Sequence, residues 1–250
     1  MRAMIFAAGL GTRLKPLTDT MPKALVPLAG KTLLQWQVEK LRDAGLSDII
    51  VNVHHFPDQI IKTVQANNGW NCNITFSDER NQLLDTGGGL RKVKEERLKI
   101  KNEPIIACNV DILSNIDVKL LIRRYAQTGV SQLVVSERQT QRYLCFDEQG
   151  LLRGWTNIAT GEVKGKDGRH LAFSGMQLLG PAVLRRLDEM HEDKFSLIDF
   201  YLRIMQTTPL QAFVPENYRM MDVGKIDEIK KAEQFAALLV SPERLELSTH

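Results

Sequence analysis

The stretch that decides the fold is Ala3-Met4-Ile5-Phe6-Ala7-Ala8-Gly9-Leu10-Gly11-Thr12-Arg13-Leu14. Its apolar first part, residues 3–7, predicts a buried strand, and the glycines after it predict a tight loop. In an open α/β sheet, ligands bind beyond the carboxyl ends of the strands, so this loop is a candidate binding site. Gly9 and Gly11 lack a Cβ atom, which lets backbone N–H groups approach phosphate oxygens, and Arg13 adds a forked positive charge.

Beyond this loop, short apolar runs alternate with segments of helical period, which is the pattern of βα units that form a mostly parallel sheet. The further strands are predicted at residues 48–53, 73–76, 104–108, 131–136, 172–179 and 210–214, and a hairpin at 144–147 and 151–155 precedes a polar loop that ends at 168. The helices are predicted at residues 33–44, 58–67, 89–98, 117–128, 181–187, 197–205 and 225–239. The sequence therefore predicts an α/β fold in one domain, residues 1–240, followed by a flexible tail at 241–250.

The composition indicates an ordinary soluble enzyme-sized protein. Of its 250 residues, 43% are hydrophobic and 25% are charged, and no apolar run reaches the roughly 18 residues that span a bilayer. We therefore expect a cytoplasmic protein without a membrane partner. Cys72, Cys108 and Cys145 lack metal-site spacing and fit a reducing compartment. The net charge of +3 is small, and its basic residues form no stripe, so we expect no nucleic-acid partner.

Two common nucleotide-binding loops do not fit the sequence. A dinucleotide-binding loop needs a third glycine where Leu14 stands, and an acidic residue about 20 positions further on, where residues 28–32 contain none. Gly30-Lys31-Thr32 has the end of a P-loop, but Leu25 occupies the position of the leading glycine. The glycine loop therefore belongs to another class.

Residues 7–34 resemble the signature of the sugar-nucleotidyltransferase family. The family pattern A-A-G-x-G-T-R-L-x-P-L-T is followed by P-K and then by G-K-x-L, and this chain has Pro22-Lys23 and Gly30-Lys31-Thr32-Leu33 at those places. The resemblance extends through most of residues 1–235. It implies a Rossmann-like three-layer α/β/α sandwich with a mixed, mostly parallel central sheet. It also implies a nucleotide-binding half at about residues 1–135 and a sugar-binding half at about 136–240.

The same resemblance assigns roles to residues of the first half. Arg13 and Lys23 are the implied catalytic residues, which bind the triphosphate and the charge that develops at the α-phosphorus. For Lys23 the alternative is a solvated lysine after a turn. The implied nucleotide-binding set is completed by Ala7, Ala8, Gly9, Gly11, Thr12 and Asn109.

A second glycine run, Thr86-Gly87-Gly88-Gly89, precedes a predicted helix, so its N–H groups are expected to be free for an acceptor-rich ligand. It resembles the family's E-T-G-G-G segment, which lies against the nucleotide base, and it most resembles the N-acetylmuramate α-1-phosphate uridylyltransferases, with mannose-1-phosphate guanylyltransferase-like proteins next. The resemblance implies that Thr86, Gly87 and Gly88 bind nucleotide. A mobile loop is the alternative. Upstream, Glu79 is a candidate acceptor for an N–H of uracil or guanine, or else a surface carboxylate.

Two aspartates are the candidate ligands of a magnesium ion. Asp111 follows a buried strand where the family has Gly-Asp, although Val110 replaces the glycine. Asp222 lies in a segment that resembles the family's W-x-D-V-G-T, with Met220 and Lys225 in place of the tryptophan and threonine. Magnesium prefers a few hard oxygen ligands together with substrate phosphates, which two carboxylates would supply. Helix capping or a turn is the alternative role for each.

The second half contains candidate residues for a sugar phosphate. Phe173-Ser174-Gly175-Met176 resembles the family's F-S/T-G-I segment, in which the glycine lets a pyranose approach closely. Ser174, Gly175 and Lys164 are therefore the candidate sugar-phosphate residues, with Lys166 and Lys194 as further possibilities. An isolated lysine is more often a solvated side chain, which is the alternative for each of the three.

Together these features predict an enzyme that couples a nucleoside triphosphate, UTP or GTP, to a sugar 1-phosphate and releases pyrophosphate. Uridylyl transfer is favoured over guanylyl transfer because of the triple glycine. A phosphocholine-type cytidylyltransferase and a non-catalytic protein that binds nucleotide sugars are the alternatives. A monomer or a small homo-oligomer is expected.

Overall fold

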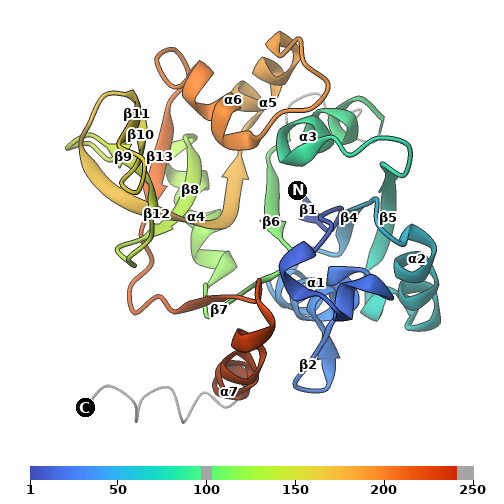
Figure 1. Cartoon of the computed structure of the whole chain (residues 1–250). Coiled ribbons are helices and arrows are strands. Elements are labelled where there is room, and N and C mark those ends of the chain that lie inside the picture. The colour runs from blue at the N-terminus through green and yellow to red at the C-terminus, as the bar shows by residue number, and fades with distance from the viewer. Residues whose placement is uncertain (97–102, 241–250) are drawn as a thin grey trace.

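The computed structural model describes residues 1–96 and 103–240, which form a large twisted sheet covered by helices (Figure 1). The main path through the sheet is β11-β10-β9-β12-β6-β1-β4-β5, and β8 and β13 extend it beside β12. The strands are β1 (Arg2–Phe6), β4 (Asp48–Val53), β5 (Asn73–Asp78), β6 (Ile105–Asn109), β8 (Ser131–Ser136), β9 (Arg142–Phe146), β10 (Leu152–Asn157), β11 (Glu162–Gly165), β12 (Arg169–Leu179) and β13 (Leu210–Phe213). One continuous sheet thus runs through both halves of the chain.

The strands of the first half are parallel. β1 lies between β6 and β4 and pairs in parallel with both, and β4 pairs in parallel with β5. The second half joins through β12, which runs antiparallel to β6, β8 and β9. The predicted mixed sheet is confirmed. Its parallel strands bring the segments after Phe6 and Asn109 to the same edge.

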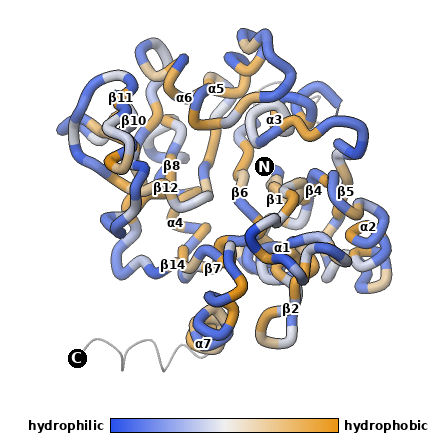
Figure 2. Tube along the Cα trace, in the orientation of Figure 1, coloured by the Kyte–Doolittle hydropathy of each residue, from blue (hydrophilic) through white to orange (hydrophobic). Residues whose placement is uncertain are grey.

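Helices cover both faces of the sheet, as predicted for an α/β/α sandwich. Alternate residues of β1 enter different cores: Ala3 and Ile5 pack on one face, Met4 and Phe6 on the other. The first face is covered by α1 (Leu33–Asp43), α2 (Pro57–Ala66), α4 (Val118–Thr128) and α7 (Ile229–Val240), and the second by α3 (Asp85–Glu96), α5 (Pro181–Arg186) and α6 (Leu197–Ile204). Figure 2 shows hydrophobic residues in the central strands and hydrophilic residues in the outer loops.

Several elements differ from the sequence-based expectation. α3 begins at Asp85, four residues before the predicted start, because the glycine run lies inside the helix. The predicted end of this helix, at 97–98, and the predicted tail at 241–250 lie outside the described residues. The polar loop predicted to end at 168 contains β11, which was missed because all four of its residues are exposed and lack an apolar pattern.

Two very short ladders were also missed. β2 (Pro27–Leu28) pairs with β3 (Lys31–Thr32), and β7 (Ile112–Ser114) pairs with β14 (Met220–Asp222). A strand of two or three residues has too few positions to show a period of two. The second ladder is the more important one, because it begins directly after Asp111 and ends on Asp222.

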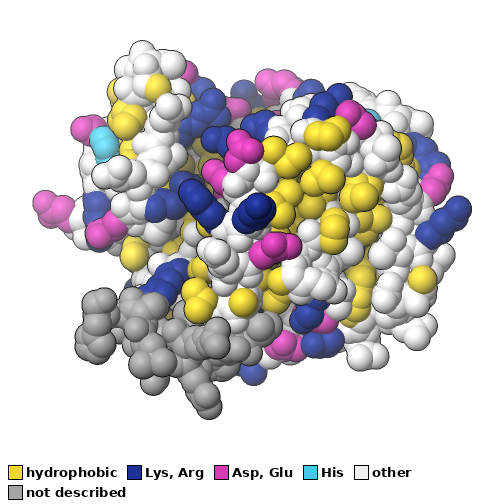
Figure 3. All heavy atoms as spheres, turned by 60° about the horizontal axis from the view of Figure 1, so that its bottom comes forward, with side chains coloured by type: hydrophobic (Ala, Val, Ile, Leu, Met, Phe, Trp, Pro, Cys, Tyr) yellow, Lys and Arg dark blue, Asp and Glu magenta, His cyan; other side chains and the backbone are white. Residues whose placement is uncertain are grey.

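Within residues 1–96 and 103–240, no helix combines the length and the apolar character needed to cross a bilayer. On the face shown in Figure 3, the basic side chains are interspersed with acidic ones, and hydrophobic side chains lie between them.

Candidate functional site

A cavity of about 250 Å³ lies at the carboxyl ends of β1 and β6, where the sequence predicted a ligand site. It collects segments that are far apart in the chain: the glycine loop, the start of α3, the end of β6 and the segment after β14. The lining residues are Phe6, Ala7, Gly9, Gly11, Thr12, Arg13, Lys23, Thr86, Asn109, Val110, Asp111 and Gly224. The structure therefore brings nine of the predicted residues together around one cavity.

At its centre, the glycine loop has a backbone conformation that only glycine adopts easily. Gly11 has φ 65°, and a Cβ atom there would lie 2.9 Å from Cγ2 of Thr18 and 3.0 Å from Cβ of Lys23. The hydroxyl of Thr18 donates a hydrogen bond to the Gly11 carbonyl at 2.9 Å, which holds the turn closed. No hydrogen bond within the described part of the chain uses the backbone N–H groups of residues 9–12. These N–H groups are available to an anion.

A buried polar network fixes the start of this loop. The N–H of Ala7 donates to Oδ1 of Asn52 at 2.7 Å, and the Asn52 amide donates to Glu79 at 2.8 Å. The other oxygen of Glu79 accepts from the N–H of Leu84 at 3.2 Å, and burial raises the pKa of this carboxyl. Glu79 is 2% exposed, so the surface alternative is wrong. Because both its oxygens are engaged, the structure gives it a positioning role beneath the loop.

Two pairs of opposite charges lie at the cavity. Lys23 is bound to Asp111, and their side chains are only 11% and 18% exposed. Arg13 lies 4.0 Å from Asp222, and this pair is largely exposed. Lys23 is therefore not the solvated lysine that a turn alone would predict. The buried pair holds one cation and one carboxylate against the glycine loop.

The ladder of β7 and β14 explains how Asp111 and Asp222 come together. Asp222 is the register partner of Ile112, which follows Asp111, and the N–H of Val223 donates to the Asp111 carbonyl at 2.9 Å. Burial and the negative charge of Asp111 both raise the pKa of Asp222, whereas Lys23 and Arg13 lower it. Two carboxylates that repel each other in this way suit a divalent cation, which removes the repulsion.

The glycine run at the start of α3 does not have the predicted free N–H groups. The N–H groups of Gly87 and Gly88 both donate to the carbonyl of Phe195, at 2.9 and 3.2 Å. A Cβ atom at Gly87 would lie 2.3 Å from the Phe195 ring, so this glycine is needed for the close contact. The expectation was wrong because the segment that contains Phe195 is far away in sequence. Thr86 does reach the cavity, and its hydroxyl accepts the N–H of Leu197 at 3.0 Å.

The other predicted residues lie around the cavity without lining it. Ala8 is buried beside the loop. Gly175 has φ 71°, and a Cβ atom there would lie 3.1 Å from Nδ2 of Asn109, so the segment of Ser174 and Gly175 packs against the cavity wall. Lys164 lies on β11, 3.4 Å from Asp199 of α6. The sequence analysis missed Asn52, although a polar residue near the end of an apolar strand was a signal for it.

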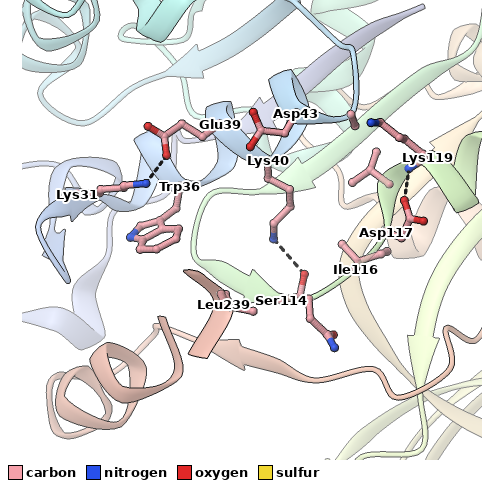
Figure 4. A pocket seen from close by; sticks show the side chains of 13 residues that line it. Lys31, Trp36, Glu39, Lys40, Asp43, Ser114, Ile116, Asp117, Lys119 and Leu239 are labelled. Carbon is pink, nitrogen blue, oxygen red and sulfur yellow. Dashed lines mark hydrogen bonds and ion pairs between the residues drawn. The ribbon is translucent and has the colours of Figure 1, made fainter. Parts of the chain in front are cut away.

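A larger cavity, about 450 Å³, lies at the other end of β7 (Figure 4). Lys40 of α1 points into it and donates to the Ser114 hydroxyl at 3.0 Å. Among the described residues no carboxylate pairs with Lys40, because Glu39 pairs with Lys31. Burial lowers the pKa of Lys40 to about 8. This cavity lacks the glycine loop and the paired aspartates.

Comparisons with known proteins find relatives in one class of enzymes. A profile described as nucleotidyl transferase matches residues 2–237. N-acetylmuramate alpha-1-phosphate uridylyltransferases of Caulobacter vibrioides and Neisseria meningitidis serogroup B are 41% and 37% identical over 44% and 47% of this chain. The matched parts cover 45% and 49% of those two proteins, so the match spans about half of their length. A mannose-1-phosphate guanyltransferase of Saccharomyces cerevisiae is 34% identical over 55% of this chain and 38% of its own.

Solved structures share the fold over nearly the whole chain. HddC from Yersinia pseudotuberculosis, complexed with GMP-PN, is 27% identical, with a TM-score of 0.73 over 94% of this chain and 99% of its own. A putative glucose-1-phosphate thymidylyltransferase from Bacillus anthracis is 14% identical, with a TM-score of 0.80 over 94% of this chain and 95% of its own. The second likeness concerns the fold alone.

Proposed function

Because this chain belongs to the nucleotidyl transferase family, we propose that it transfers the nucleotidyl group of a nucleoside triphosphate to a sugar 1-phosphate and releases pyrophosphate. The relatives named above are uridylyl and guanylyl transferases of sugar phosphates, which supports this reaction class. The observation that carries the proposal is the single cavity that unites the glycine loop, Lys23 and Asp111, with Arg13 and Asp222 at its mouth.

The chemistry needs little proton transfer. A phosphate oxygen of the sugar phosphate attacks the α-phosphorus in line, the new P–O bond forms, and the bond to pyrophosphate breaks. Because both reactants are anionic, the main tasks are to hold them together and to neutralise charge. The N–H groups of residues 9–12 would bind triphosphate oxygens, and Arg13 and Lys23 would stabilise the charge on the α-phosphate and on pyrophosphate.

We propose magnesium as the metal, held by Asp111 and Asp222. The fit rests on their hard oxygen donors and on their mutual repulsion, which adds to burial in raising the pKa of Asp222. When bound, magnesium would supply positive charge to the phosphates. The ladder of β7 and β14 keeps both carboxylates in position, and Lys23 forms an ion pair with Asp111.

The sugar phosphate is proposed to enter beside Asn109, where Gly175 and Ser174 form the adjoining wall. The absence of a Cβ atom at Gly175 lets this segment pack closely against Asn109 and Ile112. Lys164 is the proposed phosphate contact from the second half, where it lies against Asp199 and over the ring of Trp155 at 5.4 Å. For the nucleotide we favour UTP, in keeping with the two uridylyltransferase relatives.

The test is an assay of pyrophosphate release with each of four nucleoside triphosphates, crossed with a panel of sugar 1-phosphates and phosphocholine, with and without magnesium. We expect release only with a sugar 1-phosphate, highest with UTP, and abolished by a chelator. Release with CTP and phosphocholine alone would replace the proposal with the cytidylyltransferase alternative. Nucleotide binding without release under every condition would favour the non-catalytic alternative.

A further inference from the structure

Away from the cavity, three side chains that commonly ligate metals converge where β9 meets β12. They are Cys145, Asp167 and His170, and one ligand atom of each lies within 4.8 Å of the other two. They supply one sulfur, one oxygen and one nitrogen. None of them takes part in the cavity described above.

The sheet register brings these groups together. His170 of β12 is the cross-strand partner of Cys145 of β9, so the two side chains lie on the same face of the antiparallel pair. Asp167 stands three residues before His170, and its carboxylate lies 2.6 Å from the imidazole Nε2. The imidazole also stacks on Tyr143, with the ring centroids 5.6 Å apart. The ring of His170 is therefore oriented from two sides.

The backbone closes over the thiol. Gly154 of β10 is the partner of Cys145, and a Cβ atom at Gly154 would lie 2.2 Å from the carbonyl oxygen of Lys166. The N–H of Lys166 donates to the Arg153 carbonyl at 2.8 Å, which holds this segment across the sheet. Cys145 is consequently fully buried, whereas Asp167 and His170 remain open to solvent. A cation would reach the sulfur from the solvent-facing side of Asp167 and His170.

We propose that Cys145, Asp167 and His170 bind one zinc-class divalent cation, separate from the magnesium site. Zinc accepts mixed sulfur, nitrogen and oxygen ligands in a tetrahedron, in which water would occupy the fourth position. A thiolate ligand selects zinc over magnesium. The thiol proton leaves to solvent when the Zn–S bond forms, and the imidazole binds in its neutral form. The ion would tie the segment before β12 to β9.

Cation binding must displace the proton of the Cys145 thiol. Burial raises the pKa of Cys145 to about 11, so the sulfur stays protonated near neutral pH unless a cation stabilises the thiolate. Cation binding should therefore strengthen as pH rises, because a proton is displaced from the sulfur.

The test uses cobalt(II) as a spectroscopic probe on the full chain, because a cobalt–thiolate bond gives a charge-transfer absorption that oxygen ligands do not give. We expect one equivalent of cobalt to produce this band and one equivalent of zinc to remove it. Cys145→Ser should abolish the band, and His170→Gln should weaken zinc binding roughly 100-fold. The matched control is Cys72→Ser, which alters a partly buried free thiol outside the cluster and should leave the band unchanged.

A wild-type protein without the band would overturn the proposal, as would a band that survives in Cys145→Ser. Equal zinc affinity in wild type and His170→Gln would also refute it, and this variant changes only a solvent-exposed side chain, so its fold should be retained. Cobalt that binds at Asp111 and Asp222 gives no thiolate band. The two metal sites are therefore distinguished in one titration.

Discussion

Lys23 lines the smaller of the two cavities at the ends of β7 and Lys40 is one of the lysines that line the larger one, and the two have different surroundings. In the smaller cavity Lys23 is paired with Asp111 beside the glycine loop. In the larger one the Lys40 ammonium donates a hydrogen bond to the hydroxyl of Ser114, and burial lowers its pKa to about 8. Cavity size is therefore a poor guide to function in this protein. The smaller cavity has the arrangement of charge that phosphate chemistry requires.

The charged groups of the smaller cavity are in a position to exchange ionic partners, whereas Lys40 in the larger cavity is held by packing. Each cation of the smaller cavity already has an anionic partner, and each carboxylate has a cation, so triphosphate and metal can take over both sets of partners. Within residues 1–96 and 103–240, Lys40 has no carboxylate partner to exchange, and its ammonium is held by the approach of α1 to β7.

The largest effect is the expected difference in the rate of pyrophosphate release between a variant that lacks Lys23 and one that lacks Lys40. Lys23→Ala should lower the rate of pyrophosphate release roughly 100- to 1000-fold, because it removes charge stabilisation at the reacting phosphates. Lys40→Ala should change this rate less than about threefold. Steady-state assays of both variants, with circular dichroism to confirm folding, make the measurement. Comparable losses in the two variants would contradict the distinction between the cavities.

The next largest effect concerns stability. The folded-state pKa of Lys40, about 8, lies below its ordinary value of 10.5, so burial of the charge disfavours folding below pH 8. Between these values the unfolded chain binds more protons, and stability should rise with pH. Lys40→Met should therefore raise the free energy of unfolding at pH 7. We expect a net gain of about 1–2 kcal/mol, because the lost hydrogen bond to Ser114 offsets part of the benefit of removing the buried charge.

Urea denaturation across pH 7 to 10.5 measures this effect. The advantage of Lys40→Met should shrink as pH rises through that window. Lys62→Met, at an exposed position of α2, is the matched control and should show no such dependence. An advantage that stays constant with pH would mean that the ammonium of Lys40 is not held in a poorly solvated position.

Much of the fold and part of the site could be predicted from the sequence. The strands at 48–53 and 131–136 were predicted with the bounds that the structure gives, because their apolar runs end at clear turns. The sequence also allowed the prediction that Arg13, Lys23 and Asp111 line the cavity, because these residues follow the ends of parallel strands or belong to a long motif. Their roles in catalysis remain predictions.

The rest depends on contacts between distant segments. The N–H groups of Gly87 and Gly88 are occupied by the carbonyl of Phe195, over 100 residues away, and no local pattern indicates this. The hydrogen bond between Asn52 and Glu79 could not be predicted from the local sequence either, because each polar residue alone indicates a surface group. The convergence of Cys145 and His170 depends on strand register, which a sequence without metal-ligand spacing does not reveal.

A smaller effect on activity should distinguish Gly11, in the glycine loop, from Gly129, which has a similar backbone conformation elsewhere. Gly11→Ala forces a positive φ on alanine and brings Cβ against Thr18 and Lys23, whereas Gly129→Ala has φ 66° with open space around it. We expect the positive φ to cost both variants about 1 kcal/mol of stability, Gly11→Ala to lose more because of the close contacts, and only Gly11→Ala to lower kcat/KM, by roughly tenfold. Chemical denaturation and steady-state kinetics provide the two readouts. Equal kinetics in both variants would show that the close packing at Gly11 does not position Lys23.

The smallest effect is a shift of the pH profile. Burial and repulsion from Asp111 raise the pKa of Asp222, so its carboxylate takes up a proton at a higher pH than an ordinary aspartate, and the cation loses a ligand as pH falls. The acid limb of kcat/KM should therefore lie at a higher pH than an ordinary aspartate would give. Because magnesium and the proton compete for the same oxygens, a tenfold increase in magnesium should move this limb to lower pH, by at most about one unit.

Asp222→Asn cannot titrate, so its residual activity should have no limb that responds to magnesium. Asp117→Asn, which removes a helix-capping carboxylate beside the larger cavity, is the matched control and should retain the magnesium-dependent limb. If magnesium leaves the acid limb of the wild type unmoved, the titrating group is not a metal ligand. The proposed magnesium site would then be wrong, and the smaller cavity would differ from the larger one in its glycine loop and in the ion pair of Lys23 with Asp111.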